Sequence, residues 1–190
     1  MIRAFIAVEI SPTTIARITV AIADLKPKLP AVRWVAPANF HLTLKFLGDI
    51  ETHQVDAIGN ALERAISLFP RCTINAKGLG VFPGQRQPKV LWVGFIGDEL
   101  TRLAARVDVA LLPLGFTAEP RGFSPHLTIG RWRQFHRSAG DLKQELERWR
   151  DRDFGTTIVD RVILFQSELK PAGAIYSKLK VFKLNDQPID

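Results

Sequence analysis

A short pattern occurs twice in this chain and limits its possible folds more than any other sequence feature. The chain reads His-Leu-Thr-Leu at 41–44 and His-Leu-Thr-Ile at 126–129, so the second copy follows the first by 85 positions. The copies use two of the chain's four histidines. Because successive side chains of a strand point to opposite faces, each copy predicts a strand with an imidazole and a hydroxyl on one face and aliphatic side chains toward a core.

The helices predicted before the two copies are related by the same offset. Aliphatic residues recur at helical spacing at 15, 18, 22 and 25, and again at 100, 103, 107 and 110. No long linker or low-complexity tract separates the halves. We therefore expect one bilobal domain over 1–190, made of two pseudo-symmetric repeats, roughly 1–95 and 96–190, that fold alike and face each other.

The remaining patterns predict an α+β fold. Strands are expected at 4–9, 33–35, 40–47, 72–76, 90–95, 126–129, 158–165 and 176–184, and further helices around 55–66 and 142–149. Turns are expected at 36–39 and 119–122, and a loop at 78–88. Helices and strands do not alternate strictly, which favours antiparallel sheets that line a central cleft and carry the helices on their outer faces.

Composition places limits on partners and location. Twenty-six Lys and Arg against nineteen Asp and Glu give a formal net charge of +7, and part of the excess lies at Arg121, Arg131, Arg133 and Arg137. Such a charge attracts polyanions and is compatible with RNA, although many basic proteins bind no nucleic acid. We expect a cytoplasmic, monomeric protein with no membrane partner, and a buried, apolar role for the single cysteine, Cys72.

The paired histidines indicate acid–base chemistry. A lone strand histidine is more often structural than catalytic, but two matched copies reverse that preference. Histidine both donates and accepts protons near neutral pH. If His41 and His126 face one cleft, one can take a proton from water while the other gives a proton to a leaving oxygen, as displacement at phosphorus requires. From the residues alone, either histidine can take either role.

The threonines of the two copies suit the same reaction. Thr43 and Thr128 share the faces of the histidines and can each donate a hydrogen bond to a phosphoryl oxygen. Their other interpretation is simple β-propensity, which is weaker for two threonines in register with histidine. No motif with metal-ligand spacing is present in the sequence, so we expect no metal and no cofactor.

Several residues near the copies have two interpretations. Lys45 would share the face of His41 by strict alternation, where it could contact substrate charge or lie solvated at the end of the strand. Arg131 would face away from His126 unless the strand ends or twists after Gly130. The loop at 78–88, with Arg86 and Lys89 nearby, could form a basic rim over the cleft or an ordinary hairpin connection.

The isolated histidines and the nearby aromatic residues have less specific roles. We expect His53 and His136 to lie on the surface. Four aromatic residues flank the copies and could stack on a base, but core packing is the expected role of each: Trp34, Phe40, Phe123 and Trp132.

Taken together, these segments resemble the 2H phosphoesterases, and most closely the RNA 2′,3′-cyclic phosphodiesterases, also called 2′-5′ RNA ligases. The resemblance spans nearly the whole chain. It rests on the two His-x-Thr-x motifs within 39–48 and 125–131, on Ala-Phe-Ile-Ala-Val at 4–8, on Gly-Val-Phe-Pro at 80–83 and on Phe-Gln-Ser-Glu-Leu at 165–169. Some relatives carry a second aromatic residue beside Phe5, where this chain has Ile6.

The resemblance implies a bilobal fold and metal-independent hydrolysis of RNA 2′,3′-cyclic phosphate ends, such as those of tRNA fragments, to 2′-phosphates. It implies that His41 is the proton donor and His126 the proton acceptor, with Thr43, Thr128 and Arg131 on the phosphate. It also implies a reversible ligation that joins RNA through a 2′-5′ linkage. Two alternatives are a non-catalytic module that binds RNA ends or nucleotides, and a phosphodiesterase of small cyclic nucleotides.

Overall fold

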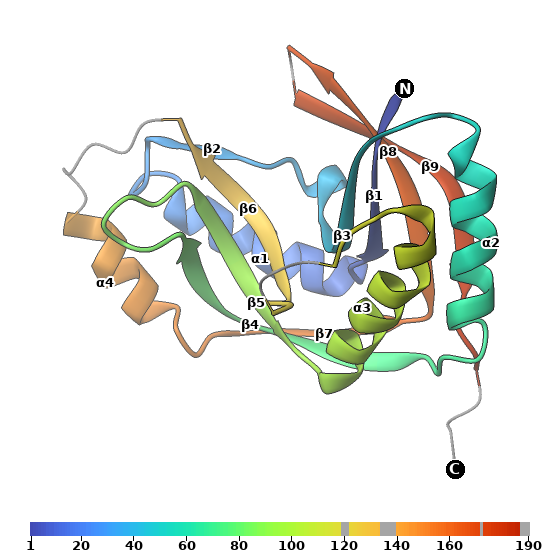
Figure 1. Ribbon diagram of the computed structural model, residues 1–190. Coiled ribbons are helices and arrows are strands. Elements are labelled where there is room, and N and C mark those ends of the chain that lie inside the picture. The colour runs from blue at the N-terminus through green and yellow to red at the C-terminus, as the bar shows by residue number, and fades with distance from the viewer. Residues whose placement is uncertain (119–121, 134–139, 172, 187–190) are drawn as a thin grey trace.

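The computed structural model describes residues 1–118, 122–133, 140–171 and 173–186 (Figure 1). Its strands are β1 (Ile2–Glu9), β2 (Val32–Trp34), β3 (His41–Ile50), β4 (Cys72–Phe82), β5 (Val90–Ile96), β6 (His126–Trp132), β7 (Asp153–Val159), β8 (Arg161–Lys170) and β9 (Gly173–Lys183). Its α-helices are α1 (Pro12–Leu25), α2 (Gln54–Ile66), α3 (Asp98–Leu111) and α4 (Gly140–Arg148). Single 3-10 turns lie at Pro37–Asn39 and Leu112–Leu114.

The strands form two antiparallel sheets, which confirms the predicted α+β class. Sheet A has the order β3-β1-β8-β9, and sheet B has the order β2-β6-β5-β4-β7. One continuous apolar core includes side chains from both sheets and from all four helices named above. The two sheets therefore belong to one folding unit.

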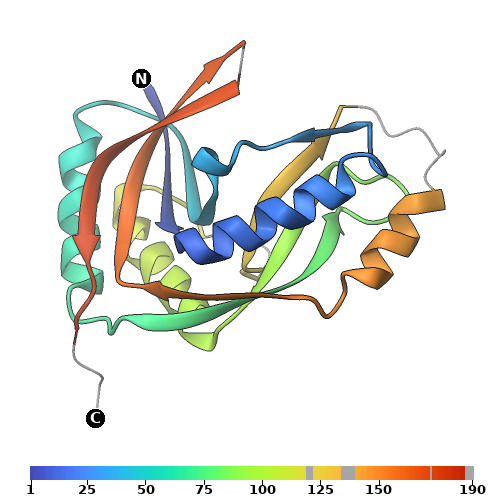
Figure 2. The same cartoon turned by 180° about the vertical axis from the view of Figure 1, so that it is seen from behind.

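The helices cover the sheets from outside. Helices α2 and α3 pack on each other beside sheet A, and α1 and α4 pack against β7 and β4 of sheet B. Figure 2 shows α1 lying across the back of the molecule, between the regions of α2 and α4. The start of α1 follows from its sequence, since Ser11 caps the Thr14 amide and Pro12 occupies the first turn.

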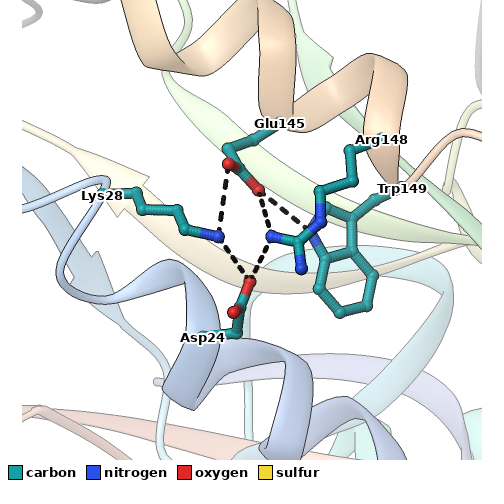
Figure 3. Close-up of polar contacts among 5 residues, drawn as sticks. All are labelled: Asp24, Lys28, Glu145, Arg148 and Trp149. Carbon is teal, nitrogen blue, oxygen red and sulfur yellow. Dashed lines mark hydrogen bonds and ion pairs between the residues drawn. The ribbon is translucent and has the colours of Figure 1, made fainter.

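A polar cluster fastens α4 to the end of α1 (Figure 3). The largely buried Glu145 carboxylate accepts from the Trp149 indole at 3.1 Å and lies 3.3 Å from both the Lys28 amine and the Arg148 guanidinium. Asp24 on α1 pairs with the same two cations at 2.7 and 2.8 Å. Each charge in the cluster thus lies next to an opposite charge, and these ion pairs hold α4 against the end of α1.

Strands from the first and the second half of the sequence occur together in each of the two sheets. The motif strand lies beside the strand that precedes the helix before it in both sheets, giving β3-β1 in sheet A and β6-β5 in sheet B. The next strand in sheet A is β8, from the second half of the chain, and the next strand in sheet B is β4, from the first half. The sheets are therefore similar in arrangement but interleaved along the chain.

Several predicted boundaries are wrong for local reasons. Strand β4 continues to Phe82, because Gly78 adopts a φ of +73° at a register shift and the pairing with β5 then resumes. The connection that remains, 83–89, is closed by the Lys89 amide, which donates to the Phe82 carbonyl at 2.7 Å. The strand predicted at 158–165 is two strands separated by Asp160. Most of the turn predicted at 119–122 lies outside the described residues, as do Arg121, His136 and Arg137.

Candidate active site

The two motif strands have the same pattern of exposure. Over the first seven residues of β3 and of β6, half-buried, buried and exposed residues follow in the same order. The histidine and threonine of each copy are half-buried, and the two aliphatic residues between and after them are buried. The predicted division of faces is therefore confirmed in both strands.

Each motif strand also contains an extra residue immediately after the threonine. Against β1, Thr43 pairs with Ala7 and Lys45 pairs with Ile6, so Leu44 has no partner of its own. Against β5, Thr128 pairs with Trp92 and Gly130 pairs with Leu91, which leaves Ile129 unpaired. A bulge of this kind shifts the alternation by one residue. We number the motif positions along each strand from its histidine. The sixth position, occupied by Phe46 or Arg131, therefore lies on the face of the histidine, and the fifth does not.

The bulge in β3 overturns both interpretations of Lys45. Its side chain is 2% exposed, forms an ion pair with Asp108 of α3 and donates to the Thr117 carbonyl at 2.8 Å. It neither faces substrate nor lies in solvent. Phe46 takes the place on the histidine face that alternation would assign to Lys45, and it is 61% exposed.

The bulge in β6 brings Arg131 to the face of His126 and Thr128. Arg131 is exposed, and its charge acts on both His41 and Tyr176 of sheet A. The histidine face of β6 is therefore turned toward the histidine face of sheet A. The sequence predicts that Arg131 shares the face of His126 only if the regular alternation of the strand changes near Gly130. The bulge produces this change.

The two imidazoles are held in the same way. Nδ1 of His41 lies 2.8 Å from the Asn39 carbonyl, and Nδ1 of His126 lies 2.7 Å from the Ser124 carbonyl. A carbonyl only accepts, so each Nδ1 carries the proton and donates it. Each Nε2 is thereby left as the nitrogen that can exchange a proton with a ligand. The side chain of Asn39 in turn donates to the Ala174 carbonyl at 2.8 Å, which ties this support to β9.

Aromatic rings surround both histidines. The His41 ring lies 4.7 Å from Phe5 and makes an edge contact with Tyr176 at 5.0 Å, measured between centroids. The His126 ring makes an edge contact with Phe82 at 4.9 Å and lies 6.5 Å from Trp92. These rings restrict how each imidazole can turn.

Burial and charge act together on His41. Burial lowers the pKa of its imidazole, and the nearby Arg131 charge lowers it as well, while the hydrogen bond to Asn39 acts in the opposite direction. Burial and a like charge both disfavour the imidazolium. The free protein therefore holds His41 neutral over a wider pH range than an exposed histidine.

The chain matches the family model described as LigT-like phosphoesterase over residues 8–92 and 95–176. It belongs to that family. An RNA 2′,3′-cyclic phosphodiesterase of Methanothermobacter thermautotrophicus is 33% identical over 184 residues, which cover 96% of this chain and 99% of the relative. One of Aquifex aeolicus is 36% identical over 156 residues, which cover 80% of this chain and 81% of the relative.

Solved structures of similar proteins have the same fold. The crystal structure of TT0787 of Thermus thermophilus matches with a TM-score of 0.83 and 25% identity, covering 98% of this chain and all of that one. E. coli LigT complexed with 3′-AMP matches with a TM-score of 0.80 and 24% identity, covering 97% and 99% of the two chains. With this coverage, both matches extend over the two sheets and the helices on their outer sides.

The aromatic residues at the site of this LigT-like phosphoesterase are not the four that flank the motifs in the sequence. Phe40 and Trp132 are buried in the core, and Trp34 and Phe123 pack against it, which confirms core packing as their role. The rings around the histidines come instead from β1, β4, β5, β8 and β9. Phe5 is detectable by alternation along β1, whereas the others depend on which strands become neighbours.

The remaining candidates from the sequence are Cys72, His53 and the segment with Arg86 and Lys89. Cys72 is buried, which confirms its expected apolar role, and burial raises the pKa of its thiol. His53 is exposed before the first turn of α2. The segment with Arg86 and Lys89 is a hairpin connection, and a role for these residues toward substrate stays a prediction. No group of three His, Cys, Asp or Glu side chains in the described ranges is arranged to hold a metal ion, and no helix there is long and apolar enough to cross a membrane.

Proposed function

We propose that this chain hydrolyses the terminal 2′,3′-cyclic phosphate of RNA to a 2′-phosphate and a free 3′-hydroxyl. The relatives named above as RNA 2′,3′-cyclic phosphodiesterases support the reaction, and the paired histidine faces support its acid–base mechanism. In this mechanism water attacks phosphorus as the bond to the 3′ oxygen breaks. One histidine accepts the proton of water, and the other supplies a proton to the 3′ oxygen.

His41 is the proton donor and His126 the acceptor in this proposal. This assignment rests on the sixth motif position, where sheet A carries the exposed Phe46 and sheet B carries Arg131. An aromatic face suits a nucleobase, so the terminal nucleoside lies over sheet A and its 3′ oxygen lies next to His41. Water then approaches from the side of His126, in line with the bond that breaks.

The remaining motif side chains bind the phosphate. Thr43 and Thr128 each donate a hydroxyl hydrogen bond to a non-bridging oxygen, and the Arg131 guanidinium supplies a charge-assisted bond. The negative charge that increases during attack is thus met from both sheets, with no step that requires a metal. Arg131 serves a second purpose, because its charge favours release of the His41 proton.

The proposal also covers the domain organisation, the oligomeric state, the cellular location and the RNA partners. The chain acts as a single bilobal domain over 1–190 and as a cytoplasmic monomer, and RNA fragments such as tRNA halves are its partners. The same step with an RNA 5′-hydroxyl in place of water forms a 2′-5′ linkage and releases the 3′-hydroxyl. The net charge of +7 favours such polyanions over neutral substrates.

The observation that carries this proposal is the matched support of the two imidazoles, each of which leaves Nε2 for the ligand. The test is incubation of a defined oligoribonucleotide ending in a cyclic phosphate, in EDTA, with 31P NMR of the product. We expect complete conversion to the 2′-phosphate.

Three other results would contradict the proposal in different ways. Tight binding with no product would identify a binding module. Hydrolysis of mononucleoside cyclic phosphates but not of the RNA would identify a small-molecule phosphodiesterase. A 3′-phosphate product would show that the 2′ oxygen leaves and would reverse the placement of the ribose.

A further inference from the structure

A row of three polar side chains on sheet A has no role in the proposed reaction. Arg3 on β1 pairs in register with Ser167 on β8, and Ser167 pairs with Tyr176 on β9. Phe5 and Phe165 lie two residues further along the same strands, and their rings stack at 5.2 Å. Side chains two residues apart share a face, so Arg3 and Ser167 project on the same side as the rings around His41.

The Tyr176 phenol connects this row to the reaction site. Its ring contacts His41 edge-on, with 5.0 Å between centroids, and it also contacts Phe5 at 5.1 Å. Burial raises the pKa of the phenol, while the charges of Arg131 and Arg3 act to lower it. Two guanidinium groups, one from each sheet, therefore act on a single hydroxyl beside the histidine.

The polar side-chain groups of this row have no bonding partner among the residues that the structure describes. Within the part of the chain that the structure describes, the side chains of Arg3 and Ser167 and the Tyr176 hydroxyl form no hydrogen bond or ion pair. Asp49 is the register partner of Arg3 on β3 but forms no ion pair with it, and Glu9, at the other end of β1, pairs with Lys178 at 2.7 Å. The Arg3 charge is thus open to an anion from outside.

We propose that Arg3, Ser167 and Tyr176 form a second phosphate subsite, which binds the phosphodiester on the 5′ side of the terminal nucleotide. This inference rests on the proposed hydrolysis of RNA cyclic ends. A guanidinium and two hydroxyls are the donors that a phosphodiester accepts from. The row lies one step, two residues or about 6.8 Å along β1, beyond the ring of Phe5. The subsite makes the protein select an RNA chain over a single nucleotide.

The measured quantity is the chain preference, defined as kcat/KM for a cyclic-ended dinucleotide divided by kcat/KM for the mononucleoside cyclic phosphate. A general loss of activity cancels in this ratio. We expect Arg3→Gln to lower the preference about tenfold, because it removes a charge-assisted hydrogen bond, and Ser167→Ala to lower it by a smaller factor. Arg64→Gln, which removes the same charge from the exposed last turn of α2, should keep the preference of the wild type.

A dinucleotide with an uncharged methylphosphonate linkage tests the contact itself. The wild type should lose most of its preference for this compound, and Arg3→Gln should lose nothing further. An unchanged preference in the wild type, or a further loss in Arg3→Gln, overturns the subsite and leaves the proposed hydrolysis intact. If the wild type hydrolyses neither cyclic compound, the proposed function fails, and the subsite fails with it.

Discussion

Strands β3 and β6 follow the same backbone course and differ most in the character of their fifth and sixth residues. Both hold a histidine by its Nδ1, bury the aliphatic residue that follows and bulge after the threonine. At the sixth motif position, one strand carries Phe46 and the other Arg131. In the proposed mechanism, the shared features provide two proton-transfer groups, and the sixth residue gives the site a nucleoside side and a phosphate side.

The fifth motif position differs because the two strands have different neighbours. A Cβ at Gly130 would lie 2.4 Å from Cγ1 of Val32 on β2, so only glycine fits there. Strand β3 is instead the edge of sheet A, and the space beside it admits Lys45 with its partner Asp108. The packing around a duplicated strand, rather than its backbone, therefore decides which residues can diverge.

The largest effect should come from the feature that the strands share. His41→Ala and His126→Ala should each lower kcat by about 10³-fold or more, because each removes a general acid or base. Steady-state hydrolysis of the cyclic-ended RNA measures this loss, with circular dichroism to verify the fold. Near-normal turnover in either variant would mean that the strands are not functionally equivalent.

The next effect should come from the phosphate side. Arg131→Gln should lower kcat/KM about 10²-fold by removing a charge-assisted contact to the phosphate. The matching change Arg33→Gln, on the strand beside it, serves as the control for loss of one positive charge. Equal losses of kcat/KM in the two variants would mean that Arg131 only attracts the negatively charged RNA and does not contact the phosphate.

The same variant has a predicted sign in the pH profile. Arg131 lowers the pKa of His41, so its removal should raise that pKa. A proton donor is active below its pKa, and the descending limb of kcat/KM should therefore move to higher pH in Arg131→Gln. A limb that moves down or does not move would contradict His41 as the donor.

A smaller effect concerns stability at the fifth position. Lys45→Met should lower the free energy of unfolding by about 2 kcal/mol, less than the roughly 3–5 kcal/mol typical of fully buried pairs. The reduction reflects the Asp108 side chain, which is 24% exposed and keeps some hydration. Urea denaturation measures the change, and Lys170→Met, in an exposed pair with Glu168, should change stability by less than about 1 kcal/mol.

The smallest effect should come from the nucleoside side. Phe46→Ala should raise KM about tenfold for a cyclic nucleotide and leave KM for ribose 2′,3′-cyclic phosphate, which has no base, nearly unchanged. The exposed Phe46 makes few contacts that stabilise the fold, so the variant should remain folded. An equal increase in KM for both substrates would mean that the nucleobase does not bind on Phe46.

Local patterns predicted the strands and their faces, because alternation and helical spacing depend on neighbours in sequence. The placement of His41, Thr43, His126 and Thr128 follows directly from that alternation. The bulges after the two threonines could not be predicted, since no residue type marks them, and Lys45 was misplaced for that reason. The pairing of β8 with β1 and of β6 with β5, and with it the ring contacts that the neighbouring strands bring to the histidines, depends on tertiary structure that no local pattern records.

The proposed mechanism gives different roles to two histidines that their strands hold alike. A cyclic substrate in which sulfur replaces the 3′ bridging oxygen tests it directly, because a thiolate leaves without a proton from the protein. We predict that His41→Ala regains most of its activity on this substrate, while His126→Ala stays inactive. Recovery in His126→Ala alone would reverse the roles, and equal behaviour of the two variants would contradict the division of the site into two sides.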